Sequence, residues 1–210
     1  MRVDEFLNVL EEAAPAALAE EWDNVGLMVG RRDAESSGVL VALDLRPEVV
    51  ERARADGHGI ILTHHPLIFP SLVSVSPATA AGGLALTAAE AGITVVAAHT
   101  NLDAAAGGLN DLMAAALGMV EVTPLAPSAP DVSTGLGRVG TLPADVRLDA
   151  LADRADALWP SGARVSGDPG RVVRRLALCT GSGAGLIDAA RAAGAGAYMT
   201  GDLKYHGCDR

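Results

Sequence analysis

The chain has 210 residues, of which 50% are apolar and only 3% aromatic, and its formal net charge is −10. This length accommodates one large domain or two small ones, with a core built from Ala, Val, Leu and Ile. Lys204 is the only lysine. Because a binder of the phosphate backbone needs clustered basic residues, we exclude nucleic acid as a partner.

No apolar run approaches the roughly 20 residues of a membrane span, so we expect no contact with a membrane. The sequence begins with acidic residues and lacks the apolar segment of a secretory signal. Two cysteines without such a signal, Cys179 and Cys208, indicate a reducing compartment. We therefore predict a cytoplasmic protein, with Cys179 as a free buried thiol.

The first predicted elements are a helix and a short strand. Asp4 is a suitable cap for a helix that ends near Pro15 and has apolar residues at helical spacing. Residues 21–30 (EWDNVGLMVG) predict a polar turn that leads into a strand. We interpret Trp22 as a core anchor, and residues 23–24 as a turn that bonds its own backbone.

A strand–helix–strand unit follows. Residues 38–45 (GVLVALDL) predict a buried strand, and Pro47 opens a helix that ends at Gly57. In residues 59–69 (GIILTHHPLIF), the apolar run bounded by Gly59 and Pro66 predicts the next strand. Two adjacent imidazoles, His64 and His65, come directly before Pro66. They therefore lie at the carboxyl end of a core strand, which is the edge where open α/β sheets bind ligands.

The same alternation continues toward the middle of the chain. Residues 83–91 and 109–117 predict helices, and residues 93–98 predict a buried strand that ends in residues 99–103 (HTNLD). Alternating strands and helices predict an α/β fold with largely parallel sheets flanked by helices.

Residues 123–135 (TPLAPSAPDVSTG) change the composition of the chain, and their prolines and hydroxyl residues predict an exposed connection. We therefore expect two lobes, residues 1–125 and 126–210. In the second lobe we predict strands at 138–142, 163–165, 172–180 and 196–200, and helices at 148–158 and 185–193.

Three predicted strand ends carry unusual polar groups, and four of the five histidines are among them. These groups are His64 and His65, the segment from His99 to Asp103, and the segment from Asp202 to His206. Neutral imidazole and carboxylate are the ligands of Zn, Mn, Fe and Ni sites. One histidine per ion would suit a pair of metals roughly 3.5–4 Å apart. The alternative is that the histidines are structural hydrogen-bonding groups.

The segment Gly181, Ser182 and Gly183 lies between a predicted strand and helix. Backbone N–H groups in such a loop can bind an anion, which would suit a phosphate-bearing substrate. The commoner role of such a loop is a tight turn, because the full dinucleotide or P-loop pattern is missing.

Four segments give the chain a resemblance to a known family. Residues 22–27 (WDNVGL), 62–67 (LTHHPL), 98–103 (AHTNLD) and 200–206 (TGDLKYH) occur in the order seen in the GTP cyclohydrolase I type 2 homologues, the NIF-three-like family. The glycine segment at 181–183 also fits, so the chain resembles this family over nearly its whole length.

The resemblance implies a NIF-three-like fold, two divalent metal ions (Zn, Mn, Fe or Ni) and a homo-oligomer, often a ring-shaped hexamer. It implies His64 on one ion, and His65 and Asp103 on the other. His99, Asp202 and His206 would lie beside the metals or face the substrate. The family supplies a further histidine and glutamate after the motif that ends at His206. These 210 residues contain no such stretch, so we expect a second lobe truncated at its C-terminus.

The function that the resemblance implies is a metal-dependent hydrolase acting on a small molecule, either a nucleotide such as GTP or a phosphoester. No residue is assigned as catalytic. The alternative is a non-catalytic metal-binding protein, metal chaperone or scaffold, which would use the same histidines. A third reading is a dinucleotide-binding protein built on the glycine loop, with Asp202 as the ribose partner.

Overall fold

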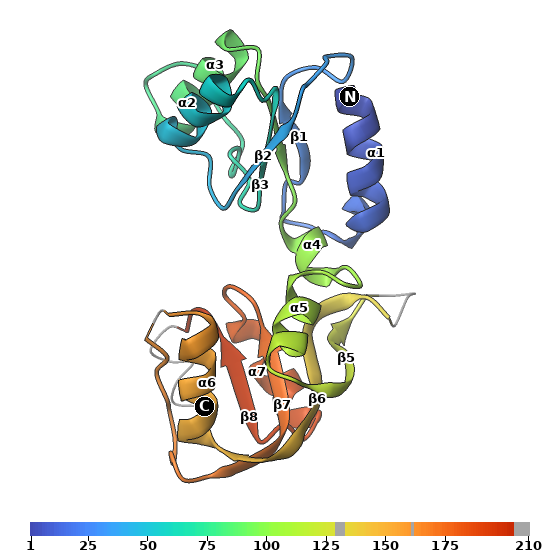
Figure 1. The fold of residues 1–210 in the computed structure, drawn as a ribbon, viewed down its shortest axis with the longest axis vertical. Coiled ribbons are helices and arrows are strands. Elements are labelled where there is room, and N and C mark those ends of the chain that lie inside the picture. The colour runs from blue at the N-terminus through green and yellow to red at the C-terminus, as the bar shows by residue number, and fades with distance from the viewer. Residues whose placement is uncertain (129–132, 161, 204–210) are drawn as a thin grey trace. The chain divides into compact units, whose positions relative to one another are not determined.

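The computed structural model describes residues 1–128, 133–160 and 162–203. The chain divides into two compact units, Met1–Leu102 and Asp103–Arg210, each with its own sheet and helices (Figure 1). This division comes earlier in the chain than the predicted one at residues 125 and 126. None of the helices in the described ranges combines the length and the apolarity that a membrane span needs.

In the first unit, helices and strands alternate as the sequence predicts. The elements are α1 (Val3–Ala13), a 3₁₀ turn (Ala16–Leu18), β1 (Gly26–Val29), β2 (Val39–Ala42), α2 (Pro47–Asp56), β3 (Ile60–Thr63), α3 (Ala80–Glu90) and β4 (Thr94–Ala97). The strand order is β1-β4-β3-β2, in which β2, β3 and β4 are parallel and β1 pairs with β4 in the antiparallel direction.

Helices cover both faces of this sheet. Val3 of α1 packs with Ile60 and Val96, whereas Val50 of α2 and Ala88 of α3 lie in a second cluster on the other face. Strands β3 and β4 are central, and β4 is buried along its whole length. Continuous apolar runs are typical of strands buried on both faces, which explains why these two strands were easy to predict.

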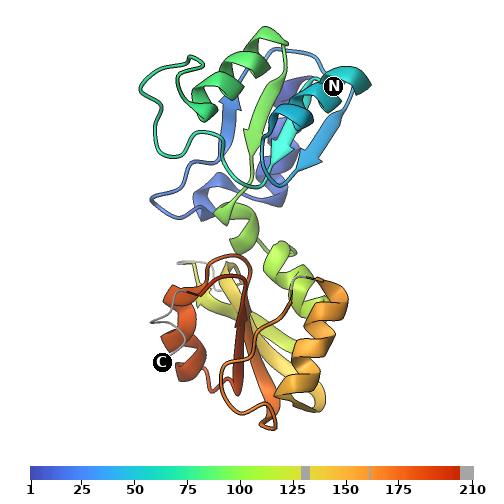
Figure 2. The ribbon, with the colours of Figure 1, turned by 90° about the vertical axis from the view of Figure 1, so that its left-hand side faces the viewer.

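The second unit is also α/β. Its elements are α4 (Thr100–Ala104, which begins in the first unit), α5 (Leu109–Ala116), β5 (Val120–Pro127), β6 (Gly135–Arg147), α6 (Leu148–Leu158), β7 (Val172–Cys179), a 3₁₀ turn (Ala184–Leu186), α7 (Ile187–Ala192) and β8 (Ala197–Thr200). The strand order is β5-β6-β7-β8. Helices α5 and α6 pack on one face and α7 on the other (Figure 2).

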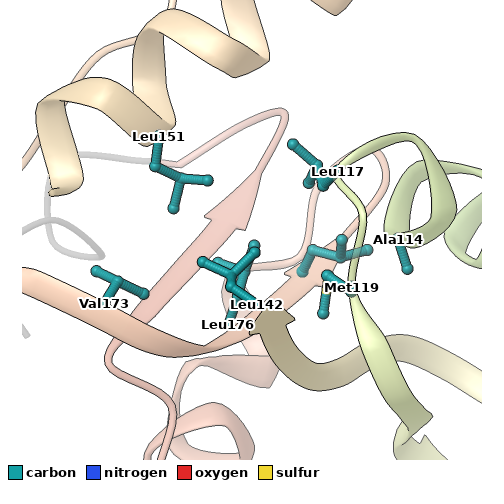
Figure 3. Packing of buried hydrophobic residues seen from close by; sticks show 8 residues of the cluster. Ala114, Leu117, Met119, Leu142, Leu151, Val173 and Leu176 are labelled. Atoms are coloured by element: carbon teal, nitrogen blue, oxygen red, sulfur yellow. The ribbon is translucent and has the colours of Figure 1, made fainter. Parts of the chain in front are cut away.

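The largest apolar cluster of the second unit lies beneath α5 and α6 (Figure 3). Leu151 of α6 and Leu117, which follows α5, point toward Leu142 and Leu176 of the sheet. Leu142 and Leu176 have no exposed surface, and burying each such side chain stabilises the fold by about 1.5–3 kcal/mol. This cluster therefore fixes the two helices on the sheet.

The α/β class with two helix-flanked sheets is confirmed, but the strand directions of the second sheet differ from the predicted largely parallel arrangement. There, β5–β6 and β6–β7 are antiparallel and only β7–β8 is parallel. The antiparallel direction of β5 and β6 follows from their connection, because the link from Pro127 to Gly135 is too short for the crossover that parallel strands need.

The exposed connection predicted at residues 123–135 is wrong in its first part, because β5 runs through Pro124 to Pro127. Strand β5 is an edge strand, where proline costs no ladder hydrogen bond on its open side. The short strand predicted at residues 163–165 does not form. Helix α3 begins before its predicted start, because the Thr79 side chain accepts a hydrogen bond from Gly82 N (3.1 Å) and caps it.

Candidate metal centre

Three histidines of the first unit come together at the carboxyl ends of the parallel strands. His64 and His65 follow β3, and His99 follows β4. One ring nitrogen from each can be chosen so that all three lie within 4.8 Å of one another. The ring centroids are 5.1 Å apart for His64–His65, 5.1 Å for His64–His99 and 5.6 Å for His65–His99. We call these three residues the histidine cluster.

The backbone at the end of β3 is held in place. His64 N and His65 N donate hydrogen bonds to the carbonyl oxygens of Ala42 (3.1 Å) and Leu43 (2.9 Å), so the pairing with β2 continues past Thr63. The Thr63 hydroxyl donates to the carbonyl oxygen of His65 (2.8 Å). The main chain from which the two adjacent imidazoles project is therefore fixed.

Each ring of the histidine cluster has its Nδ1 atom held by an oxygen. The partners are the Ala98 carbonyl for His64 (2.9 Å), Asp44 Oδ1 for His65 (2.7 Å) and Asp23 Oδ1 for His99 (2.8 Å). An Nδ1–H that donates to an oxygen leaves the lone pair of the neutral ring on Nε2. This is the arrangement found around metal-ligating histidines, in which the second ring nitrogen is fixed by a carbonyl or carboxylate.

The donor set fits a divalent transition metal. Three neutral imidazoles suit Zn, Fe or Ni, and three protein ligands leave further coordination positions for water or substrate. His65 is half-exposed and His99 is largely buried, with side-chain exposures of 48% and 20%. The histidine cluster can therefore hold a metal and still be reached from solvent.

Asp23 is more enclosed than Asp44, the other carboxylate that holds a ring of the histidine cluster, because the Asp23 side chain has no exposed surface. Its carboxylate accepts hydrogen bonds from His99 Nδ1, from Asn24 N (2.8 Å) and from both the backbone and the hydroxyl of Thr100. Burial raises the pKa of Asp23. The hydrogen bonds from His99 and Thr100 lower it by more than burial raises it, so the pKa of Asp23 lies below its usual value. The ionised form of Asp23 is therefore favoured, and its carboxylate orients His99.

Asp44 plays the same part for His65, although it is more exposed. The hydrogen bond from His65 is the main cause of the lowered pKa of Asp44, and Arg46 contributes as well. Asp44 follows β2 and Asp23 precedes β1. This position near a strand end is the only feature of the sequence that could have indicated a role for either acid. The partners of His65 and His99 were not predicted. The predicted backbone bond within residues 23–24 is confirmed.

The other predicted site residues belong to the second unit or fall outside the described residues. Asp103 is buried in the second unit, where its Oδ1 accepts a hydrogen bond from the Thr180 hydroxyl (2.8 Å). Asp202 is exposed after β8, and His206 lies outside the described residues. His58 precedes β3 at the opposite end from His64. It is half-buried, and its Nδ1 has no hydrogen-bond partner.

The glycine loop after β7 is used for packing. Gly183 N donates to the Thr200 hydroxyl (2.9 Å), and Gly183 O accepts from the Tyr198 hydroxyl (2.7 Å). A Cβ at Gly183 would lie 2.2 Å from the Tyr198 oxygen, so only glycine fits. The loop leads into a 3₁₀ turn and the six-residue helix α7. These contacts agree with the tight-turn interpretation at Gly183.

Comparisons with known proteins agree with the resemblance in the sequence. The family model Duf34/NIF3 (NGG1p interacting factor 3) matches residues 1–210. A Streptomyces coelicolor protein named GTP cyclohydrolase 1 type 2 homolog is 40% identical in an alignment 210 positions long that covers 98% of this chain and 74% of the relative. A Clostridium perfringens protein of the same name is 35% identical, over 98% of this chain and 79% of the relative.

Two solved structures share the fold. A Bacillus cereus protein related to NIF3 superposes with a TM-score of 0.93 at 25% identity, over 100% of this chain and 84% of that one. A Staphylococcus aureus hypothetical protein superposes with a TM-score of 0.92 at 28% identity, over 99% of this chain and 81% of that one. The predicted α/β fold of this type is thereby confirmed.

Proposed function

The chain belongs to the Duf34/NIF3 family, and we propose that its histidine cluster binds divalent metal for the hydrolysis of a nucleotide. The observation that carries this proposal is the triple anchoring of Nδ1 in His64, His65 and His99, which presents a ligand nitrogen from each ring. The nucleotide comes from the name of the relatives, GTP cyclohydrolase 1 type 2 homolog.

The proposal keeps two ions, of Zn, Mn, Fe or Ni, because His64 and His65 are adjacent and each can serve a different ion. Asp103 stays a predicted further ligand on the strength of the resemblance, and so does a homo-oligomer, with a hexamer as its expected form. Bound divalent metal supplies Lewis-acid chemistry, polarising a substrate oxygen and making water a better nucleophile near neutral pH.

The residues of this chain have defined tasks in that reaction. Asp44 and Asp23 hold His65 and His99 in one tautomer and one orientation, and the Ala98 carbonyl does so for His64. Preorganised ligands lose little freedom when they bind, which raises metal affinity. The half-exposed His65 leaves the solvent side of the histidine cluster open to a small molecule.

One observation favours a second candidate, a non-catalytic metal-binding, metal-chaperone or scaffold protein. Asp23 and Asp44, the carboxylates that touch the histidine cluster, each already hold a histidine, and both have lowered pKa values. A general base works best with a pKa near the operating pH, so neither is suited to accept a proton from water. The same anchored histidines would serve metal storage or delivery.

Turnover by the loaded protein separates the two candidates. The full chain would be loaded with Zn, Mn or Fe, its metal content measured by mass spectrometry, and its activity assayed against GTP and a panel of phosphoesters. Turnover that disappears in His99→Ala supports the hydrolase. Stoichiometric metal without turnover supports the non-catalytic candidate, and a chain that retains no metal contradicts both.

A further inference from the structure

Two exposed aromatic rings lie together beside the histidine cluster. The chain has only two Trp, two Tyr and two Phe, yet Trp22 and Phe69 are 57% and 53% exposed. Trp22 was expected in the core, and this expectation is wrong. The two ring centroids are 5.8 Å apart and the ring planes meet at 66°. The edge of one ring therefore meets the face of the other.

The fold holds this pair in place. The Asn24 side-chain amide donates a hydrogen bond to the Ile68 carbonyl (2.8 Å). This bond joins the segment that carries Trp22 to the segment that carries Phe69. Asp23, between Trp22 and Asn24, is fixed by its bonds to His99 and Thr100. The hydrogen bonds that anchor the histidine cluster therefore also fix the residue next to Trp22.

A hollow of about 390 Å³ opens at this pair of rings, lined by residues 22–24 and 68–71. The Trp22 and His99 rings meet edge to face, with centroids 6.2 Å apart and planes at 77°. The indole ring therefore lies directly beside the histidine cluster. The lining is mixed, because the side chains of Asn24 and Ser71 lie among the apolar groups.

We propose that Trp22 and Phe69 form a subsite for the planar heteroaromatic ring of the substrate, which stacks on the indole beside His99. This inference rests on the proposed function and adds the residues that would recognise its substrate. A stacked ring gains from each aromatic face, and its polar edge can be met by Asn24 and Ser71. An aliphatic chain would bury those two side chains without offering them a hydrogen bond.

Guanosine is a suitable probe, because it carries a purine ring and no phosphate. Its binding to the full chain would be measured by calorimetry, with and without Zn²⁺, and by quenching of tryptophan fluorescence. Ribose 5-phosphate, which has no ring, serves as the control ligand. The variants are Trp22→Leu, Trp22→Phe and Phe69→Leu, with Trp159→Phe as the matched control because Trp159 packs on the core of the second unit.

The subsite predicts that Trp22→Leu weakens guanosine binding about tenfold or more, whereas Trp22→Phe, which keeps a stacking face, loses less. Metal content stays unchanged in both variants, and Trp159→Phe binds like wild type. Equal binding by wild type and Trp22→Leu would overturn the subsite, as would guanosine binding no tighter than ribose 5-phosphate. A shift of Trp22→Leu to a smaller oligomer would also overturn it, because the pair would then be a subunit contact.

Failure of the proposed function gives a different result from failure of the subsite. If wild type retains no metal but binds guanosine in a Trp22-dependent way, the metal proposal fails and the subsite stands. If metal binds and Trp22→Leu leaves guanosine affinity unchanged, the subsite fails and the metal proposal stands.

Discussion

His99 Nδ1 lies 2.8 Å from Asp23 Oδ1, although the two residues are 76 positions apart in the sequence. The Asp23 carboxylate has no surface exposed to solvent. The hydrogen bond between His99 and Asp23 joins the segment before β1 to the end of β4 and sets the orientation of one ring of the histidine cluster. Loss of such a partner typically lowers metal affinity by about 10–100-fold.

The first prediction follows from that bond. We expect Asp23→Asn to bind Zn²⁺ about 10–100-fold more weakly than wild type, because the amide is neutral and no longer matches the donors of His99 and Thr100. Calorimetric titration measures the change. The matched control is Asp33→Asn, whose exposed carboxylate pairs only with Arg31 among the ion pairs of the described residues. Equal affinities in wild type and Asp23→Asn would show that Asp23 has no part in the site.

The second prediction concerns Arg138, whose side chain is buried in the second unit. All five of its N–H groups are bonded: two to the Asp111 carboxylate, and three to the carbonyl oxygens of Gly135, Gly137 and Ala105. Arg138→Met would remove all five bonds and leave the half-buried Asp111 carboxylate without the guanidinium that pairs with it. We expect a loss of about 3–5 kcal/mol in the free energy of unfolding, measured by urea denaturation.

Arg147→Met is the matched control, because Arg147 forms an exposed ion pair with Asp149. Removing an exposed pair costs about 1 kcal/mol or less. If the two substitutions destabilised the chain equally, the buried network of Arg138 would be without special importance.

The third prediction is a pH dependence. The hydrogen bond from Arg138 is the main reason why the pKa of Asp111 lies below its usual value. A carboxyl with a lowered folded-state pKa contributes stability that is fully present above its unfolded pKa of about 4 and is lost as the pH falls through the lower folded pKa. The stability gap between wild type and Asp111→Asn should therefore be constant above about pH 5 and shrink below about pH 4. A gap that stays constant down to pH 2 would refute this.

The fourth prediction concerns Cys179. Burial, with a smaller contribution from the Asp103 charge, raises its pKa to about 11. At pH 9 only about 1% of this thiol is ionised, and the thiolate is the reactive form. In a Cys208→Ser background, we expect iodoacetamide to react with native Cys179 far more slowly than with the same chain in urea. Similar rates in the two conditions would show that the native thiol is accessible and reacts like an unfolded cysteine.

The main elements of the first unit could be predicted because their signals are local. The apolar runs of β3 and β4 and the histidines after them can be read from adjacent residues, and the structure places His64 and His65 at that strand end. The histidine cluster differs in membership from the predicted ligands, since His99 joins it. That depends on how β3 and β4 align, which no local pattern records.

Three features could not be read from local patterns. Asp44 and Asp23 hold histidines that are 21 and 76 residues away, so their roles depend on tertiary contacts. Trp22 looked like a core residue because indole is usually buried, whereas its neighbour Asp23 took the buried position. Strand β5 contains two prolines that only an edge position tolerates, and edge position is a property of the assembled sheet.

The most direct test of the central claim is the metal content of three purified single variants, His64→Ala, His65→Ala and His99→Ala, measured by mass spectrometry after loading with Zn²⁺ and gel filtration. His58→Gln is the matched control, because His58 lies at the other end of β3. We predict that each of the three alanine variants retains less metal than wild type and that His58→Gln retains as much. Undiminished metal in all three would contradict the account, because the histidines would then be structural.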